Sequence, residues 1–209
     1  SVIESPGSFT VPAKTLTDFV NLLSDDKVEL EQKENELVIK CGKSSTKIKG
    51  APADEFPVIP TIEGETGFLV EAELLKKGLA QVTPAIAKND IRPELSGVYF
   101  GFNQNAEKSL VMVATDSYRL AEKHLKLTQG EAQFRIIVPS HTAHEIGRIL
   151  AFGENGEEKG ARILIGENQL AIHYGNVQLI SRLVDGQYPD YTQIIPKEFK
   201  TTALFSTNH

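Results

Sequence analysis

Asp116, Ser117 and His124 are the residues whose types come nearest to a hydrolase site, which combines an acid, a hydroxyl nucleophile and a histidine base. Asp and Ser are also favoured in tight turns, where their side chains form local hydrogen bonds to the backbone. The stretch Thr115–Tyr118 lies between two alternating apolar and polar runs, which is typical of a β-hairpin. We therefore interpret it as a turn and keep a small hydrolase at these three residues as an alternative.

His141 and His144 lie three positions apart at the start of a predicted helix, a spacing that can place both imidazoles on one metal ion. The sequence offers no further ligands at a recognisable spacing, and Ser140 before them is a typical N-cap. It also lacks a glycine-rich phosphate loop and the motifs G-x-S-x-G and H-E-x-x-H. We therefore predict a protein that is not an enzyme and has no bound metal or cofactor.

Two short segments are richer in polar and aromatic residues than packing requires: residues 90–97 (DIRPELSG) and residues 114–121 (ATDSYRLA). The first joins a predicted helix to a strand. The second contains the hairpin turn, and its return strand is predicted to carry Tyr118, Arg119 and Leu120.

Asp90 and Asp116 could each form an ion pair with Arg92 or Arg119 and so fix the two loops. The sequence leaves both pairings open. One interpretation of the two segments is a buttressed pair of turns without a ligand. The other is an apolar groove with a few polar anchors, suited to a short peptide.

The composition is that of an ordinary soluble globular protein, with 40% hydrophobic and 24% charged residues. The longest apolar runs are far too short to cross a bilayer, so we expect no membrane partner. The net charge of −6 argues against dense phosphate contacts, which need clustered Lys and Arg, although a local basic face remains compatible with it. Cys41, the single cysteine, is expected in the core; it excludes an internal disulfide and fits a cytoplasmic location.

The sequence repeats a pattern of one strand, one helix and three strands. The first copy has a strand at 8–12, a helix with the apolar stripe Leu16, Phe19, Val20 and Leu23, and alternating segments at 28–31, 37–41 and 46–49. The last copy has a strand at 134–139, a helix with the stripe Ala143, Ile146, Ile149 and Leu150, and alternating segments at 163–165, 170–173 and 177–183. In both copies the first strand ends in Val-Pro, and an aromatic residue followed by proline closes the copy.

A third copy lies between these two. It has a strand at 67–70, a helix at 71–82 with Leu75, Leu79 and Val82 facing inward, and strands at 97–102, 110–115 and 118–124. Pro84 is expected to break the helix, because proline cannot occupy a helix interior unperturbed.

One such unit buries little surface, so two should pair into a domain. The sequence therefore predicts an α+β fold in which β-α-β-β-β units pair, with helices on one face of antiparallel sheets. Residues 1–60 are interpreted as the second half of a preceding domain, 61–66 as a linker and 67–195 as a complete domain. Residues 196–209 are interpreted as a linker and the first strand, at 202–205, of a following domain. We thus expect the chain to be a fragment of a longer protein.

The segments ATDSYRLA (114–121), RPELSGV (92–98) and LVDGQYPDY (183–191), together with the Val-Pro helix starts, closely resemble the DNA polymerase III beta subunits, the bacterial replicative sliding clamps. The resemblance extends over essentially the whole chain, in order. It implies the clamp fold, with three similar domains in each protomer and two protomers closed into a homodimeric ring around duplex DNA. In that family helices line the hole and sheets form the outside. The chain would then cover the back half of the first domain, the whole middle domain and the start of the third.

The resemblance also implies a hydrophobic pocket for short clamp-binding peptides between the second and third domains. The pocket residues that it assigns here are Leu95, Thr115, Ser117, Tyr118, Arg119, Leu120, Pro189 and Ile194. Ser117 stands where the family commonly has Gly and Tyr118 where it commonly has His, which implies a reshaped rim. The partners implied are the polymerase III alpha subunit, the clamp loader and other proteins with clamp-binding motifs.

For DNA, the resemblance implies contact by inward helix faces and nearby loops. The candidates are Lys76, Lys77, Lys88, Asn89, Arg92 and Arg148. Glu71, Glu73 and Glu145 lie on the same helices, so the surface is expected to be only slightly positive. A ring held on DNA by topology needs little affinity, and strong phosphate contacts would resist sliding.

The leading hypothesis is a non-catalytic processivity factor that tethers the replicative polymerase to DNA and presents a peptide pocket to its partners. The alternatives are the small hydrolase described above and a structural repeat module without DNA partners.

Overall fold

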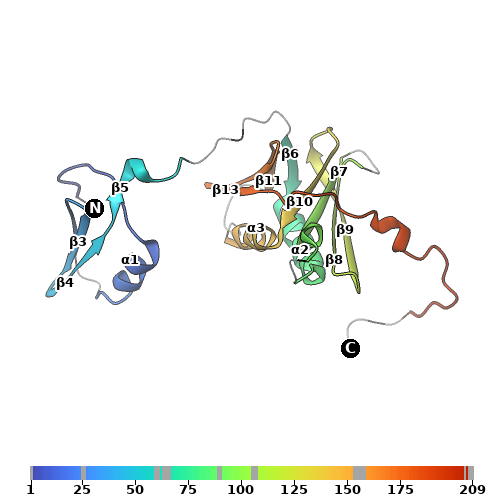
Figure 1. The fold of residues 1–209 in the computed structure, drawn as a ribbon, viewed down its shortest axis with the longest axis horizontal. Coiled ribbons are helices and arrows are strands. Elements are labelled where there is room, and N and C mark those ends of the chain that lie inside the picture. Colours follow the sequence, from blue (N-terminus) through green and yellow to red (C-terminus); the bar gives the residue numbers. More distant parts are fainter. Residues whose placement is uncertain are drawn as a thin grey trace. The chain divides into compact units, whose positions relative to one another are not determined.

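The computed structural model describes residues 2–24, 27–58, 62, 67–88, 91–104, 108–152, 159–204 and 206. The chain divides into two compact units, Ser1–Thr61 (unit 1) and Ile62–His209 (unit 2), and each combines antiparallel strands with helices (Figure 1). Apart from Ile62, the linker predicted at 61–66 lies outside the described residues. No helix in the described part of the chain is long and apolar enough to cross a membrane.

Unit 1 follows the predicted order of one strand, one helix and three strands. Its elements are β1 (Phe9–Thr10), α1 (Ala13–Val20), β2 (Val28–Lys33), β3 (Glu36–Cys41), β4 (Ser44–Lys49), β5 (Ala51–Pro52) and a 3₁₀ turn (Ala53–Glu55). The strands form an antiparallel sheet in the order β2-β3-β4 and a short β1-β5 pair. Ile39, Cys41 and Ile48 are buried, which confirms that the cysteine is a core residue. The strands are longer than the alternating segments predicted at 28–31, 37–41 and 46–49, because β2, β3 and β4 extend almost to the turns between them.

Unit 2 contains two further copies of the pattern. The first consists of β6 (Gly67–Glu71), α2 (Ala72–Val82), 3₁₀ turns at Thr83–Ala85 and Pro93–Leu95, β7 (Gly97–Phe102), β8 (Ser109–Thr115) and β9 (Leu120–Gln129). The second consists of β10 (Phe134–Pro139), α3 (Ser140–Phe152), β11 (Gly160–Ile165), β12 (Gln169–Tyr174), β13 (Val177–Arg182) and a closing 3₁₀ turn at Tyr191–Ile194. As predicted, α2 ends just before Pro84, where the chain tightens into a 3₁₀ turn.

The two copies of unit 2 exchange their first strands. Their strands form one eight-stranded sheet in the order β10-β7-β8-β9-β6-β11-β12-β13. The first strand of the second copy pairs with the second strand of the first (β10 with β7), and the reciprocal pair is β6 with β11. This reciprocity makes each copy necessary to complete the sheet of the other.

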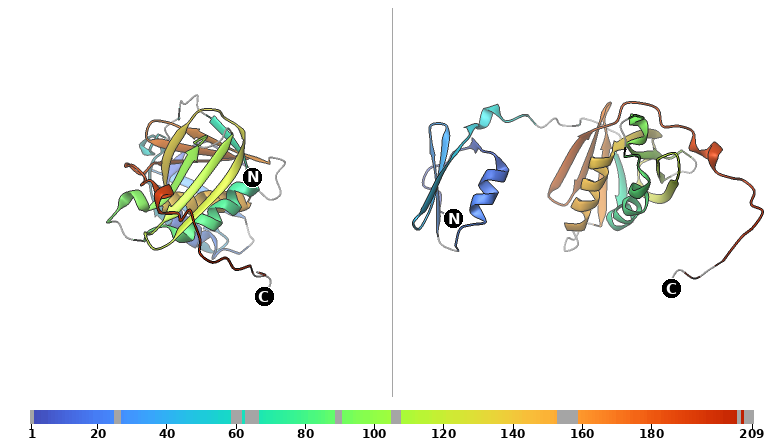
Figure 2. Two further views of the ribbon diagram at one scale, coloured as in Figure 1. Left: turned by 90° about the vertical axis from the view of Figure 1, so that its right-hand side faces the viewer. Right: turned by 60° about the horizontal axis from the view of Figure 1, so that its bottom comes forward.

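The main core lies between this sheet and its two helices, which pack against each other (Figure 2). The predicted stripe of α2 is confirmed, since Leu75, Leu79 and Val82 are buried. In the predicted stripe of α3, Ala143, Ile146 and Leu150 are buried, and Ile149 is partly buried against the same core. The rings of Phe68 and Phe102 stack at a centroid distance of 4.2 Å, joining the two halves of the sheet.

A second apolar cluster lies on the face of the sheet opposite the helices. Val111, Val113 and Ile137 point to this side, and Tyr188 and Tyr191 from the segment after β13 pack on them. The run Leu110–Ala114 is therefore apolar at every position because both faces of β8 are covered.

The strand predicted at 202–205 is not formed. Thr202–Leu204 have no regular structure and Leu204 is exposed, while Phe205 lies outside the described residues. A strand needs a neighbour to pair its backbone groups, and no described strand lies beside this segment.

Candidate functional site

The hairpin between β8 and β9 holds five of the predicted pocket residues. Thr115 and Leu120 are the last facing pair of the two strands, and residues 116–119 form the turn. The return strand therefore begins at Leu120, and the prediction that it includes Tyr118 and Arg119 was wrong. The cause is Asp116, whose Oδ1 accepts the backbone N–H groups of Tyr118 and Arg119 at 3.0 Å each and so holds them in the turn.

A dense set of short hydrogen bonds stiffens this turn. The Thr115 hydroxyl donates to the Arg119 carbonyl at 2.7 Å and accepts the Ser117 N–H at 3.2 Å. Arg119 Nε donates to Asp116 Oδ2 at 3.0 Å. The backbone N–H donors, and then the Arg119 side chain, lower the pKa of the Asp116 carboxyl.

The ion-pair question left open by the sequence is settled for the described residues. Asp116 contacts Arg119, and Arg92 contacts Glu94 at 2.9 Å. Asp90 lies outside the described residues. The two loops are thus each fixed internally by their own acidic residue.

A second element, the segment 183–194, crosses the sheet next to the hairpin. It is anchored at its start by two backbone bonds, from Leu183 N–H to the Asn168 carbonyl at 3.0 Å and from Val184 N–H to the Ile137 carbonyl at 2.9 Å. The Tyr99 ring then packs against Tyr188, with ring centroids 5.1 Å apart.

Tyr191 fastens the crossing segment to β9 through a hydrogen bond with the Glu122 carboxylate, which also contacts His124 Nε2 at 2.8 Å. Burial, followed by this carboxylate, raises the pKa of the Tyr191 hydroxyl. Burial also raises the pKa of Tyr188. The Tyr188 hydroxyl lies beside the backbone of Thr115 without a hydrogen bond to any described residue.

The structure brings some of the predicted pocket residues together and leaves others apart. Leu95 and Leu120 share one apolar cluster with Tyr188 and Tyr191. Leu95 is buried beneath this surface, so it supports the surface rather than forming its rim. Pro189 follows Tyr188 in the crossing segment and is half-buried.

Four predicted residues, among them Arg119, project from this surface into solvent. Tyr118 is 99% exposed at the tip of the hairpin, and Ile194 is 65% exposed where the closing 3₁₀ turn ends. Ser117 is also exposed, and its backbone adopts the left-handed conformation with φ of 74°. Both elements therefore present apolar or aromatic side chains that are incompletely covered by the chain itself.

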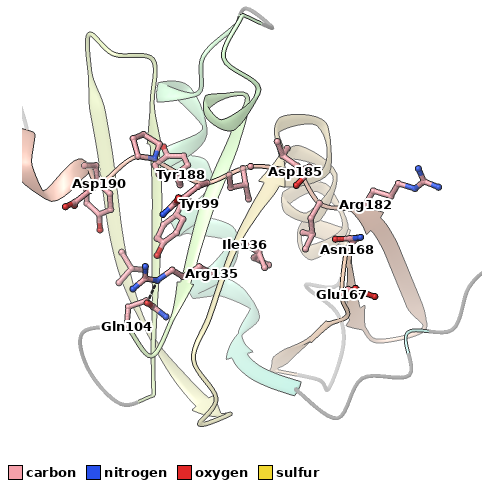
Figure 3. Close-up of a pocket in the computed structure, with 18 of the residues that line it drawn as sticks. Tyr99, Gln104, Arg135, Ile136, Glu167, Asn168, Arg182, Asp185, Tyr188 and Asp190 are labelled. Carbon is pink, nitrogen blue, oxygen red and sulfur yellow. Dashed lines mark hydrogen bonds between the residues drawn. The ribbon is translucent and has the colours of Figure 1, made fainter.

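A groove of about 1050 Å³ on the same side of the sheet was not predicted. It is lined by Tyr99, Gln104, Arg135, Asn168, Arg182 and Asp190 among others, and Arg135 donates to Gln104 across its floor (Figure 3). Pro189 lines this groove and is also a predicted pocket residue. The sequence signal that could have indicated a covered outer face was the continuous apolar run of β8.

The predicted DNA-facing residues lie on both helices and the following loop. Lys76 and Lys77 are on α2, Arg148 is on α3, and Lys88 and Arg92 are on the connection from α2 to β7. Asn89 lies outside the described residues.

Several of these cations already have carboxylate neighbours. Lys76 contacts Glu73 at 2.7 Å and Arg148 contacts Glu145 at 2.6 Å, each along its own helix. Such exposed pairs are worth little to stability, but each partly neutralises the field that the cation presents. Any positive surface here is therefore modest.

The hydrolase alternative is incompatible with the geometry. His124 pairs with Val111 four residue pairs away from the end of the hairpin, about 13 Å at the usual rise of a strand. Ser117 lies in the turn beyond that end, and Asp116 is engaged by Arg119. The described residues contain no group of three potential metal ligands, and His144 Nδ1 contacts the Ser140 carbonyl at 2.7 Å.

Comparison with known proteins gives consistent matches along the chain. The family described as DNA polymerase III beta subunit, central domain, matches residues 69–190. The family described as DNA polymerase III beta subunit, N-terminal domain, matches residues 1–60. The beta sliding clamp of Streptococcus pneumoniae is 33% identical over 208 residues, covering 98% of this chain and 53% of its own length.

Solved structures agree with the sequence matches. The DNA polymerase sliding clamp of Bacillus subtilis superposes with a TM-score of 0.82 at 33% identity, over 94% of this chain and 50% of that one. A sliding clamp from Pseudomonas aeruginosa bound to griselimycin gives a TM-score of 0.80 at 29% identity, over 94% of this chain and 53% of that one. The chain spans about half the length of the relatives that it matches.

Proposed function

The chain belongs to the DNA polymerase III beta subunit family, whose members are sliding clamps, and from this premise we propose that it forms part of a clamp that encircles duplex DNA. The observation that carries the proposal is the ordered match of two clamp domains to the chain, together with the reciprocal strand exchange between the two repeat copies inside unit 2. We assign residues 1–60 to the second half of the N-terminal domain, 67–195 to the middle domain and 196–209 to the start of the C-terminal domain.

The proposed role is mechanical rather than catalytic. The titratable groups around the hairpin serve its structure: Asp116 holds the turn, and Glu122 holds Tyr191 and His124. A clamp raises the processivity of a polymerase by keeping it on DNA, which requires a closed ring and a docking surface but no reacting group. We propose that two copies of the longer protein close this ring as a homodimer.

The proposed docking surface is formed by the hairpin and the crossing segment. Its base is the apolar cluster of Leu95 and Leu120, and its rim consists of Ser117, Tyr118 and Arg119, held by the buried Thr115. Pro189 and Ile194 supply the wall on the crossing segment. An apolar floor with a few fixed polar groups matches the way short peptides are bound in grooves. The partners assigned to it are the polymerase III alpha subunit, the clamp loader and other proteins with clamp-binding motifs, in the cytoplasm.

The proposed DNA-facing surface consists of the helix faces and loop that carry Lys76, Lys77, Lys88, Asn89, Arg92 and Arg148. Neutralisation of Lys76 and Arg148 by neighbouring glutamates supports weak binding. Weak phosphate contact allows the ring to slide, because few counterions are exchanged at each step.

The experiment is a binding assay with a fluorescein-labelled peptide from the C-terminal tail of a polymerase III alpha subunit. Fluorescence anisotropy should show saturable binding to the chain, and unlabelled peptide should displace it. A peptide of the same composition in scrambled order is the matched control. Equal binding of the two peptides would contradict the assignment of the docking surface.

A further inference from the structure

Two buried tyrosines attach the crossing segment (183–194) to the outer face of the sheet. Tyr188 and Tyr191 are each 9% exposed, whereas residues 192–200 are exposed throughout. Tyr191 begins the closing 3₁₀ turn, and Ile194 ends it. The position of Ile194, a wall of the proposed docking surface, therefore depends on how the Tyr191 side chain is held.

The closing turn is stiffened from within by Asp190. Its Oδ1 accepts the Thr192 N–H at 3.2 Å and the Thr192 hydroxyl at 2.5 Å, and its Oδ2 accepts Gln193 Nε2 at 2.8 Å. These bonds join the residues of the turn to one another and not to the sheet. The turn should therefore move as one piece, and the buried Tyr191 ring connects it to the sheet.

The pairing of β8 with β9 places Glu122 on the same face of the sheet as this ring. Glu122 lies opposite Val113, and His124 lies opposite Val111. Both valines belong to the apolar cluster that contains Tyr191. Because facing residues of an antiparallel pair share one face of the sheet, the Glu122 carboxylate and the His124 imidazole lie beside that cluster.

The Glu122 carboxylate has two hydrogen-bond partners. It accepts the Tyr191 hydroxyl, and its Oε1 lies 2.8 Å from His124 Nε2. Burial acts to raise the pKa of Glu122, but the bonds from Tyr191 and then from His124 outweigh it and lower that pKa, so the group is ionised at neutral pH.

The two tyrosines of the crossing segment are thus held in different ways. The Tyr188 hydroxyl has no hydrogen bond to any described residue, so Tyr188 is held by packing. Tyr191 is held by packing and also by a hydrogen bond to a charged acceptor, which is stronger than a bond between neutral groups. This bond is directional, so it can fix where the closing turn stands as well as keep it on the sheet.

We propose that Glu122 is a positioning residue of the docking surface: through the Tyr191 hydroxyl it fixes the closing turn and so sets the distance between Ile194 and the hairpin that carries Leu120. His124 holds the carboxylate in the orientation that Tyr191 requires. This role rests on the proposed function, since the surface concerned is the one assigned to partner peptides. Glu122 acts through Tyr191 and not by contact with the peptide.

Peptide affinity of variants of the whole chain tests this role in the anisotropy assay. Glu122→Ala removes the acceptor and should raise the dissociation constant of the polymerase-tail peptide about 3- to 10-fold, because a wall that is not held must be ordered on binding. Glu122→Gln keeps an oxygen that can accept the Tyr191 hydroxyl, so its affinity should return to within about twofold of the parent.

Glu36→Ala is the matched control for loss of a carboxylate. Glu36 is a half-buried strand residue in unit 1, and its carboxylate contacts Lys47 at 3.3 Å. Its replacement removes a comparable charge and contact away from the docking surface, so the peptide affinity should stay that of the parent.

A double-mutant cycle shows whether Glu122 acts through Tyr191. Tyr191→Phe removes the hydroxyl and keeps the buried ring, so it should weaken binding by about the same factor as Glu122→Ala. The double variant should bind no more weakly than either single variant, because both changes break the same bond. Factors that multiply in the double variant would mean independent action and would overturn the proposal.

Amide chemical shifts of the peptide-free chain test the positioning separately from binding. Glu122→Ala should shift the amides of residues 191–194, Glu122→Gln should shift them much less, and Glu36→Ala should leave them unchanged. Unmoved amides at 191–194 in Glu122→Ala, parental affinity of that variant, or no recovery in Glu122→Gln would each overturn the proposal. A parent chain that binds no peptide would overturn the docking role together with the proposed function, whereas a parent that binds and is insensitive to Glu122→Ala overturns the positioning role alone.

Discussion

Replacing Leu120 with aspartate places a charge where β9 begins, beside the tyrosines of the crossing segment. Leu120 is half-buried against the cluster of Leu95, Tyr188 and Tyr191. Full burial of a leucine is worth about 1.5–3 kcal/mol, so its partial loss should lower the free energy of unfolding by about 1–2 kcal/mol. A domain of ordinary stability, about 5–15 kcal/mol, remains folded after such a loss.

The effect on partner binding comes from desolvation. If an apolar peptide side chain covers position 120, the aspartate must lose water without gaining a hydrogen-bond partner, at a cost of about 1–3 kcal/mol. This cost corresponds to a dissociation constant for the peptide about 5- to 150-fold higher than that of the parent chain. The nearby Glu122 carboxylate adds repulsion and offers no compensation.

Fluorescence anisotropy with the polymerase-tail peptide measures this change, and thermal unfolding of the same samples shows that the fold is retained. Leu120→Asn is the matched control, since it removes the apolar side chain without adding a charge and should weaken binding less. A folded Leu120→Asp chain with the affinity of the parent would refute the reasoning and remove position 120 from the docking surface.

Three further predictions concern the elements that shape the site. Ser117→Val should lower the free energy of unfolding by about 1–2 kcal/mol, because a β-branched residue is strained at φ of 74°, whereas Ser117→Gly should be tolerated; urea unfolding measures both. Tyr188→Phe should raise stability by about 1 kcal/mol at neutral pH by removing a buried hydroxyl without a hydrogen-bond partner among the described residues, and an unchanged or lower value would contradict this. Because burial raises the pKa of Tyr188 and Tyr191 above the ordinary 10.0, the unfolded chain ionises first, so stability should fall only as the pH rises above about 10, as an alkaline titration of tyrosinate absorbance would show.

The element order was predictable because the helical and strand periods are explicit in the sequence. The stripe of Leu75, Leu79 and Val82 identified α2, and alternation within each copy identified the strands. The pairing of two β-α-β-β-β copies into one domain was predictable because a single copy can bury little surface. The exchange of first strands could not be read from alternation, which shows which face of a strand is buried but not which strand lies beside it.

The site was less accessible to sequence reasoning for a similar reason. Asp116 was expected to stabilise a turn. Whether its carboxylate oxygens would accept hydrogen bonds from the turn backbone or from a distant arginine depended on how β8 and β9 pair. That choice set the start of β9 at Leu120 and left Tyr118 exposed. The groove lined by Arg135 and Asn168 joins residues far apart in the chain, and neither has a local motif that would reveal it.

Mapping the bound peptide on the isotope-labelled chain by amide chemical shifts tests the central claim most directly. We predict that titration with the polymerase-tail peptide perturbs the amides of residues 115–120 and 188–194, and that the scrambled peptide does not. Perturbations confined to the groove around Arg135 and Asn168, or spread evenly over the chain, would contradict the assignment of the clamp's docking surface to the hairpin and the crossing segment.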